Sequence, residues 1–293
     1  MTATPQDSLY PRRFIRFLGT AGARFTIMRQ LRASGGIWVG LGDQAFVIDP
    51  GPGSLVRICE ATPPLDVLDL AALLLTHRHI DHSTDLNVLA EAMVEGGFRH
   101  HGHVVLPRDG RDVCCLLPYL QEKIEALHIW EEGQTIALPG GVTVEGTPLT
   151  HHHVDCFGFT LQIPGLAPMG LVSDTRFEER WVDFYRSCPL LIVNMTFAHH
   201  REGIDHLCPE DVATLIARLA PKRVILTHLG RGVLEEGPEA IARDLSRPGT
   251  EVTAATDGMV IDLDSLEIVD PSLSPVTTLS GTVPIPFLKE GLS

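Results

Sequence analysis

The stretch Leu70-Ala71-Ala72-Leu73-Leu74-Leu75-Thr76-His77-Arg78-His79-Ile80-Asp81-His82 joins an apolar run to three imidazoles and a carboxylate. The apolar half is typical of a buried strand, and in extended chain residues two apart point to the same side. His77 and His79 would therefore face one metal ion together. If the chain turns after His79, Asp81 and His82 face a second ion just beyond the strand end. Imidazole and carboxylate are ligands of zinc and its first-row neighbours, so this stretch predicts a pair of metal sites.

Length and composition predict a globular protein. The chain has 293 residues, of which 44% are hydrophobic, and this is enough for a sizeable buried core. A net charge of −14 disfavours non-specific binding to nucleic acids. No segment reaches the roughly 18 uninterrupted apolar residues of a membrane span, and residues 1–8 lack the parts of a secretory signal. The cysteines show no disulfide-framework spacing. We therefore expect a cytoplasmic protein that does not enter a membrane.

Short strand-like runs alternate with helix-like ones along both halves of the chain. The strands expected in the first half are residues 14–18, 37–41, 45–49, 73–76 and 104–106. Those expected in the second half are residues 142–145, 159–163, 170–173, 190–193, 223–227, 252–255 and 259–263. Residues 85–91 have helical composition, and apolar residues three and four apart predict an amphipathic helix over residues 209–219. Two strand-rich halves, each with helices to cover one face, indicate a two-sheet sandwich with helices outside.

The second half contains further candidate metal ligands, each at the end of a strand-like run. Two metals held by four residues are under-coordinated, so a real site needs more histidine or carboxylate from elsewhere. Asp174 ends the run at residues 170–173, and His228 ends the run at residues 224–227. The triplet His151-His152-His153 follows residues 148–150. These positions can complete the pair of sites that the first motif predicts.

The order of these motifs resembles the metallo-beta-lactamase superfamily of dinuclear hydrolases. The similarity is greatest to the branch that contains tRNase Z and the cyclic phosphodiesterase of phosphonate metabolism, which also opens on a Phe-Leu-Gly-Thr run such as residues 17–20. The resemblance extends from about residue 14 to residue 230. It implies an α/β fold of four layers, an αββα sandwich. We expect one hydrolase domain over residues 14–269, an N-terminal leader at residues 1–13 and an extended C-terminal arm at residues 270–293.

The resemblance also implies a position for each metal ligand. One ion would be held by His77, His79 and one histidine of the triplet, the other by Asp81, His82 and His228, and Asp174 would bridge the two. His152 matches the ligand of the family best, because it lies six positions before Gly158. His151 and His153 remain open as alternatives.

Two residues have an expected catalytic role. Asp81 would orient or deprotonate the attacking water while it binds the second ion. His206 lies 22 residues before His228 and resembles a histidine of this branch that assists departure of the leaving group. The other histidines have no assigned role: His199 and His200, which follow residues 196–198, and His100, His101 and His103, which match no family position and are expected in a solvated loop.

The implied cofactors are two divalent metal ions, zinc first, with manganese or iron as alternatives. Two such ions can share a hydroxide and offset the charge that grows on the oxygens of a phosphoryl group. We therefore expect a metal-dependent phosphodiesterase that uses a metal-bridging hydroxide on a small or cyclic phosphodiester. Two alternatives stay open: a hydrolase of a thioester, lactone or sulfate ester, and a binding protein that keeps the metals without turnover.

The expected partners are a small-molecule substrate and a second copy of the chain. Binding of tRNA is not expected, because tRNase Z carries a long flexible arm between its third-motif histidine and its bridging aspartate. Here only 21 residues, 153–173, separate His152 from Asp174. Members of this branch usually pair, and the C-terminal arm contains apolar side chains that a homodimer could cover: Val283, Ile285, Phe287 and Leu288.

Overall fold

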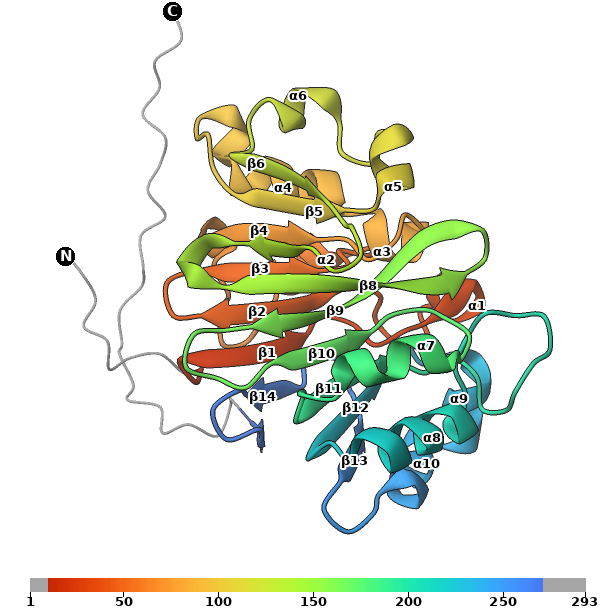
Figure 1. The fold of residues 1–293 in the computed structure, drawn as a ribbon. Coiled ribbons are helices and arrows are strands. Elements are labelled where there is room, and N and C mark those ends of the chain that lie inside the picture. The colour runs from red at the N-terminus through yellow and green to blue at the C-terminus, as the bar shows by residue number, and fades with distance from the viewer. Residues whose placement is uncertain (1–9, 271–293) are drawn as a thin grey trace, which may run out of the picture.

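The computed structural model describes residues 10–270. Two sheets pack face to face, and helices cover the outer face of each sheet (Figure 1). The expected α/β fold, a four-layer αββα sandwich, is confirmed. The strands run from Arg13 to Val269. Residues 1–9 and 271–293, which include most of the expected leader and arm, lie outside the described residues, so the boundaries of the domain stay a prediction.

The first sheet has eight strands in the order β15-β14-β1-β2-β3-β4-β5-β6. In chain order these are β1 (Arg13–Phe17), β2 (Ile37–Leu41), β3 (Ala45–Ile48), β4 (Leu70–Leu74), β5 (His103–Leu106), β6 (Ala126–Ile129), β14 (Val260–Asp262) and β15 (Ile268–Val269). The strands from β3 to β6 pair in parallel. Their carboxyl ends therefore meet at one edge of the sheet, and the segment with the first motif leaves β4 at that edge.

The second sheet has seven strands in the order β13-β12-β11-β10-β9-β8-β7. In chain order these are β7 (Thr135–Ala137), β8 (Thr143–His151), β9 (Val154–Gln162), β10 (Met169–Val172), β11 (Leu190–Asn194), β12 (Arg223–Thr227) and β13 (Glu251–Ala254). The strands from β10 to β13 pair in parallel, while β8 and β9 form a long antiparallel hairpin.

The helices cover the outer faces and the rim. Those of the first half are α1 (Ala23–Met28), α2 (Ser54–Cys59), α3 (Ile80–Ser83), α4 (Leu86–Met93), α5 (Arg108–Asp112) and α6 (Pro118–Gln121). Those of the second half are α7 (Glu179–Val182), α8 (Pro209–Leu219), α9 (Arg231–Glu236) and α10 (Pro238–Leu245). The amphipathic helix predicted over residues 209–219 is confirmed as α8, with Val212, Leu215 and Ile216 buried. No helix in the described part of the chain combines the length and apolar character needed to cross a membrane.

Strand alternation divides the side chains among three apolar cores. β1 directs Ile15 and Phe17 into the core between the sheets, whereas Phe14 joins the core under the helices of the first half. A third core lies between the second sheet and the helices of the second half. Because the central strands are buried on both faces, they appear in the sequence as continuous apolar runs.

Most expected strands are present, with shifted ends. β4 ends at Leu74, two residues before the expected end, because the backbone N–H of Thr76 donates to the side chain of Asp49 (2.7 Å) instead of to a neighbouring strand. β8 is much longer than expected and reaches His151. The sequence did not predict β6, β7 or β15. β6 is only half-buried and β15 has two residues, so neither has a long apolar run.

Candidate metal centre

The chain leaving β4 carries the first motif to the edge where the two sheets meet. His77 is completely buried, and His79 is the N-cap residue of α3, with an extended backbone. Asp81 and His82 therefore lie in the first turn of a short helix, and the chain turns after His79 as the sequence predicts. The four side chains fall into two groups of candidate ligands.

The first group consists of His77, His79 and His151, whose ligand atoms all lie within 4.8 Å of one another. The Nε2 of His151 is 3.1 Å from the Nδ1 of His79. The Nδ1 of His151 donates to the backbone carbonyl of Asp205 (2.9 Å), so its Nε2 holds a lone pair. Three ring nitrogens therefore converge on one point.

The protonation of His77 follows from its neighbours. The hydroxyl of Thr76 donates to Asp49 (2.8 Å), so the Nδ1 of His77 donates to that hydroxyl oxygen (3.1 Å) and its Nε2 is left with a lone pair. This Nε2 is buried and has no hydrogen-bond partner among the described residues. A buried polar atom without a partner costs about 1–3 kcal/mol. A metal ion at this point would satisfy it, so these residues fit the implied cofactor.

The second group consists of Asp81, His82, Asp174 and His228. The Nε2 atoms of His82 and His228 face each other at 3.2 Å. The Nδ1 of His82 donates to Asp49 (2.9 Å), so the neutral His82 ring has its lone pair on Nε2, toward His228, whose own Nδ1 contacts the hydroxyl of Thr196 (2.8 Å). Asp81 Oδ2 lies 3.4 Å from the Nε2 of His228. A cation between these two nitrogens and the carboxylate oxygen would be held by all three when both rings are neutral.

Asp174 lies between the two groups. It follows β10, and its Oδ2 is 3.5 Å from the Nε2 of His82 and 3.7 Å from the Nε2 of His151. Its Oδ1 accepts a hydrogen bond from Asn194 (2.8 Å). Burial opposes the charge of Asp174, but the surrounding histidines, His228 first, hold its pKa well below the usual range. A carboxylate whose ionised form is favoured, with one oxygen near both groups, can serve as a bridge.

The β8–β9 hairpin decides which histidine of the triplet faces the centre. His151 pairs with Val154 as the last residue of β8 and is buried on the same face as Leu149. His152 and His153 form the two-residue turn, both with positive φ (38° and 61°). The structure therefore brings His151 into the first group, one residue before the position expected for His152. The side chain of His152 is 37% exposed and groups with His151 and His206.

Burial makes the histidines of the first group neutral, which is the form that binds metal. It lowers the pKa of His77 well below the usual range, that of His151 to about 4, and that of His79 also downward. His82 differs. Burial opposes its charge too, but Asp49, Asp81 and Asp174 outweigh this and raise its pKa. The second group therefore has more carboxylates around its histidines than the first group has.

Several residues that orient the ligands were missed by the sequence analysis. The carboxylate of Asp49 accepts from both the N–H and the hydroxyl of Thr76 and from the ring of His82. Thr196 contacts the Nδ1 of His228 and, at 3.2 Å, the Nδ1 of His206. Asp49 stands at a strand end in the sequence, but no local signal links it to His82. Such partners fix the ring and its tautomer, and they tune the affinity for metal.

His206 lies beside both groups. Its Nδ1 is 3.7 Å from Asp174 Oδ2, and its ring centre is 4.9 Å from that of His151. Burial lowers the pKa of His206 to about 3. His199 instead pairs with Glu236 (2.9 Å) at an exposed position.

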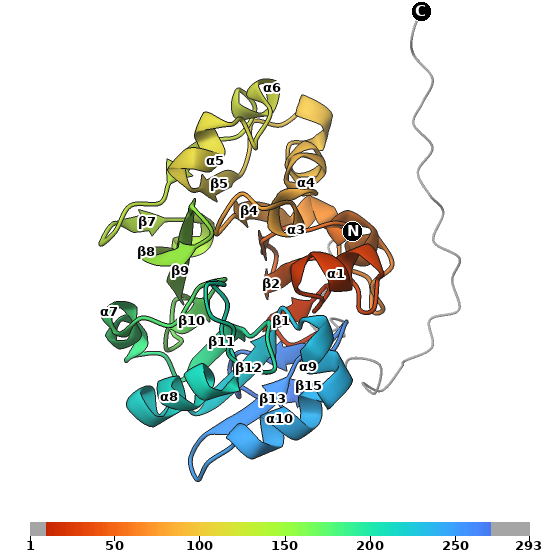
Figure 2. The same ribbon diagram turned by 90° about the vertical axis from the view of Figure 1, so that its right-hand side faces the viewer.

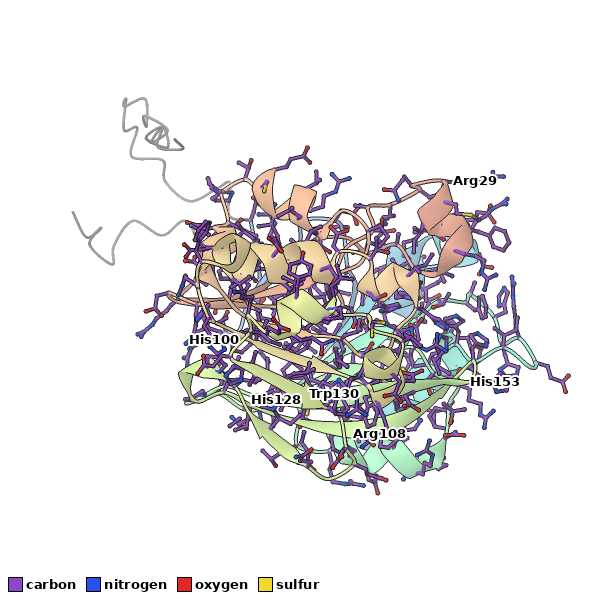
Figure 3. The ribbon with its side chains drawn as sticks, turned by 90° about the horizontal axis from the view of Figure 1, so that it is seen from above. Arg29, His100, Arg108, His128, Trp130 and His153 are labelled. Carbon is purple, nitrogen blue, oxygen red and sulfur yellow. The ribbon has the colours of Figure 1, made fainter. Side chains whose placement is uncertain are left out.

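The histidines without a family position lie elsewhere. His103 contacts His128 (3.2 Å) across neighbouring strands of the first sheet. His100 and His128 are on the side of the molecule away from His153, which marks the tip of the hairpin (Figure 3). His100 and His101 are exposed or half-buried, so this cluster takes no part in the centre.

Comparison with known proteins agrees with this geometry. The family model of the beta-lactamase superfamily domain matches residues 44–229. The uncharacterised protein MJ1374 of Methanocaldococcus jannaschii is 28% identical over 258 residues, which are 85% of this chain and 94% of that protein. The probable metallo-hydrolase YhfI of Bacillus subtilis is 24% identical over 196 residues, 64% of this chain and 76% of its own length.

Solved structures share the fold. The crystal structure of YhfI, a metallo-beta-lactamase fold protein, superposes with a TM-score of 0.70 at 20% identity, covering 86% of this chain and 99% of that one. The short form of human tRNase Z has a TM-score of 0.61 at 18% identity, and the match covers 85% of this chain and 99% of that one. A diphosphatase from the PhnP family has a TM-score of 0.62 at 17% identity, and the match covers 85% of this chain and 96% of that one. The resemblance expected from the motif order is confirmed: the family model spans more than half of the chain, which therefore belongs to the beta-lactamase superfamily and has the metallo-beta-lactamase fold.

Proposed function

We propose that this chain is a metal-dependent phosphodiesterase that acts on a small or cyclic phosphodiester. The observation that carries the proposal is the pair of adjoining ligand groups that share Asp174, with a buried, unpartnered Nε2 on His77. Two groups of this kind at the end of a sandwich suit a dinuclear centre. Zinc is the first candidate for both positions, with manganese and iron as alternatives.

The ligand set in this proposal differs from the sequence expectation at one position. The first ion would be held by His77, His79 and His151, the second by Asp81, His82 and His228, with Asp174 between them. When bound, the ions would supply positive charge and Lewis acidity at the phosphoryl group. Proton transfer would be the task of side chains around the ions.

Asp81 and His206 are the candidates for moving protons. Burial opposes the charge of Asp81, but His82 and His228 lower its pKa, so its carboxylate is ionised and can accept a hydrogen bond from the attacking water. His206 can donate a proton to the departing oxygen once it is protonated. An anionic phosphodiester beside the ring would raise its depressed pKa, because a negative charge favours the imidazolium.

The short connection between the hairpin and Asp174 favours a small substrate. Strands β9 and β10, joined by residues 163–168, occupy the interval from the hairpin turn to Asp174, so no inserted arm lies there. With a net charge of −14, these features disfavour precursor tRNA as the substrate.

A metal assay followed by a substrate panel tests the proposal. Protein purified without added metal should contain about two divalent ions per chain by elemental analysis. It should hydrolyse bis(4-nitrophenyl) phosphate or a 2′,3′-cyclic nucleotide and leave precursor tRNA uncut. Hydrolysis of only a thioester, lactone or sulfate ester would replace the phosphodiesterase with that alternative. Two bound metals without turnover on any substrate would indicate a binding protein.

A further inference from the structure

A cavity of about 340 Å³ opens beside the candidate metal centre. Three segments line it: α1 with Phe25 and Thr26, the segment after β11 with Phe197 and Arg201, and the start of α9 with Arg231. Figure 2 shows α1 and α9 near each other, together with the segment that follows β11. Its volume is within the range of roughly 300–1,000 Å³ that is usual for small-molecule sites.

Thr196 and Phe197 link the cavity to the candidate metal centre. Thr196, which contacts the rings of His228 and His206, is itself one of the lining residues. The ring of Phe197 meets that of His206 edge-on, with centres 5.3 Å apart. The side chains of Thr196 and Phe197 therefore lie between the cavity and the histidines of the candidate centre.

The lining suits a planar aromatic group that is attached to an anion. Phe25 is 64% exposed, which leaves a ring face open for stacking. The Arg201 guanidinium lies over the Phe197 ring at 4.5 Å, and it has no carboxylate partner in the described part of the chain. Aromatic rings and guanidinium planes are the groups on which proteins stack nucleobases. Thr26 adds a buried hydroxyl with no hydrogen-bond partner among the described residues.

We infer that this cavity binds an aromatic, nucleobase-sized part of the substrate, held between Phe25 and the Arg201–Phe197 pair. The inference rests on the proposed function, since it assumes that a phosphate ester binds at the adjoining centre. It narrows the substrate class to phosphodiesters of nucleosides or of similar aromatic alcohols. The unpaired cation of Arg201 adds attraction for the phosphate charge on a protein that is otherwise acidic.

Binding measurements on the metal-loaded protein test this inference without relying on turnover. Uridine 5′-phosphate carries uracil where ribose 5-phosphate carries its anomeric hydroxyl, so the ratio of their dissociation constants, measured by calorimetry, reports on binding of the base. We expect wild type to bind the nucleotide about tenfold more tightly. Phe25→Ala should reduce this ratio to about twofold, and Phe25→Trp should retain it. Equal binding of the two ligands by wild type would overturn the inference.

Phe98→Ala is the matched control, because Phe98 is 93% exposed and does not line the cavity. It should keep the wild-type ratio. A ratio lowered equally by Phe98→Ala and Phe25→Ala would also overturn the inference. The outcome is separable from that of the proposed function. If the protein prefers the nucleotide but hydrolyses no phosphodiester, the inference about the cavity stands and the proposed phosphodiesterase activity is rejected. If it hydrolyses phosphodiesters but binds both ligands equally, the proposed activity stands and the inference about the cavity is rejected.

Discussion

Asp49→Asn tests whether a carboxylate outside the proposed ligand set controls the metal affinity of the second ligand group. The Asp49 carboxylate is 12% exposed and accepts three hydrogen bonds: from Thr76 N–H (2.7 Å), from the Thr76 hydroxyl (2.8 Å) and from His82 Nδ1 (2.9 Å). Asparagine has the same shape, but its NH₂ group cannot accept. If the amide oxygen takes the place of Oδ1 and keeps the Thr76 N–H, the NH₂ group takes the place of Oδ2 and faces both the Thr76 hydroxyl and the Nδ1 of His82.

The size of the expected loss in metal affinity follows from the tautomer of His82. An NH₂ donor stabilises His82 with its proton on Nε2, which places a hydrogen where the ligand lone pair must be. Metal binding then requires the other tautomer, with one buried donor left without an acceptor, at a cost of about 1–3 kcal/mol. Since about 1.4 kcal/mol corresponds to a factor of ten, the expected loss of metal affinity is roughly 10- to 100-fold, in the range known for such outer partners.

A competition titration with a chromophoric zinc chelator measures this loss. Asp257→Asn is the matched control, because Asp257 also accepts three hydrogen bonds, from the N–H and hydroxyl of Thr20 (2.9 and 2.7 Å) and from Ala33 N–H (2.7 Å). Both variants should lose stability in urea unfolding, but only Asp49→Asn should lose metal affinity. Wild-type affinity in Asp49→Asn, or an equal loss in both variants, would refute the reasoning.

Three further predictions concern the same centre and the assembly. Asp174→Ala should lower metal content and activity together, whereas His206→Ala should keep both metals and lose turnover at least tenfold in the substrate assay; equal metal loss in both would make His206 a ligand. His151→Ala should lose at least one metal by elemental analysis while His152→Ala keeps both, and the opposite result would restore the expectation for His152. The proposed homodimer should give about twice the 32.0 kDa chain mass by light scattering at micromolar concentration, and the monomer mass would reject it. The apolar arm residues behind that expectation lie outside the described residues.

The sequence predicts the sandwich because its central strands are buried on both faces. Such strands consist almost entirely of apolar residues, so β4, β11 and β12 appear as distinct runs. Strands at the sheet edges have no such signal. β6 is half-buried throughout, and β7 buries only its middle residue, so neither is distinct from a loop.

The candidate metal centre was predictable to the extent that its residues follow strand ends. His77, His79, Asp81 and His82 lie in one short segment, and their spacing alone indicates two ligand groups. The choice among the triplet depends on where the β8–β9 hairpin turns, which no residue marks. Neither His152 nor His153 is the glycine or asparagine that usually occupies a two-residue turn with positive φ. Alternation along β8 then determines that His151 faces inward.

Thr76 shows why the remaining parts of the site have no sequence signal. Its hydroxyl donates to Asp49 and accepts from the Nδ1 of His77, and it also contacts the hydroxyl of Ser173 in the second half (2.8 Å). Its carbonyl accepts from Phe157 N–H on β9 (3.1 Å). One residue therefore sets a histidine tautomer and joins the two sheets directly behind the candidate metal centre. Apart from His77, its partners are 27 to 97 positions away along the chain, so only the fold can bring them together. Such contacts hold the candidate ligands of the two halves in their relative positions. The sequence motifs contain the candidate ligands but not the residues that make these contacts.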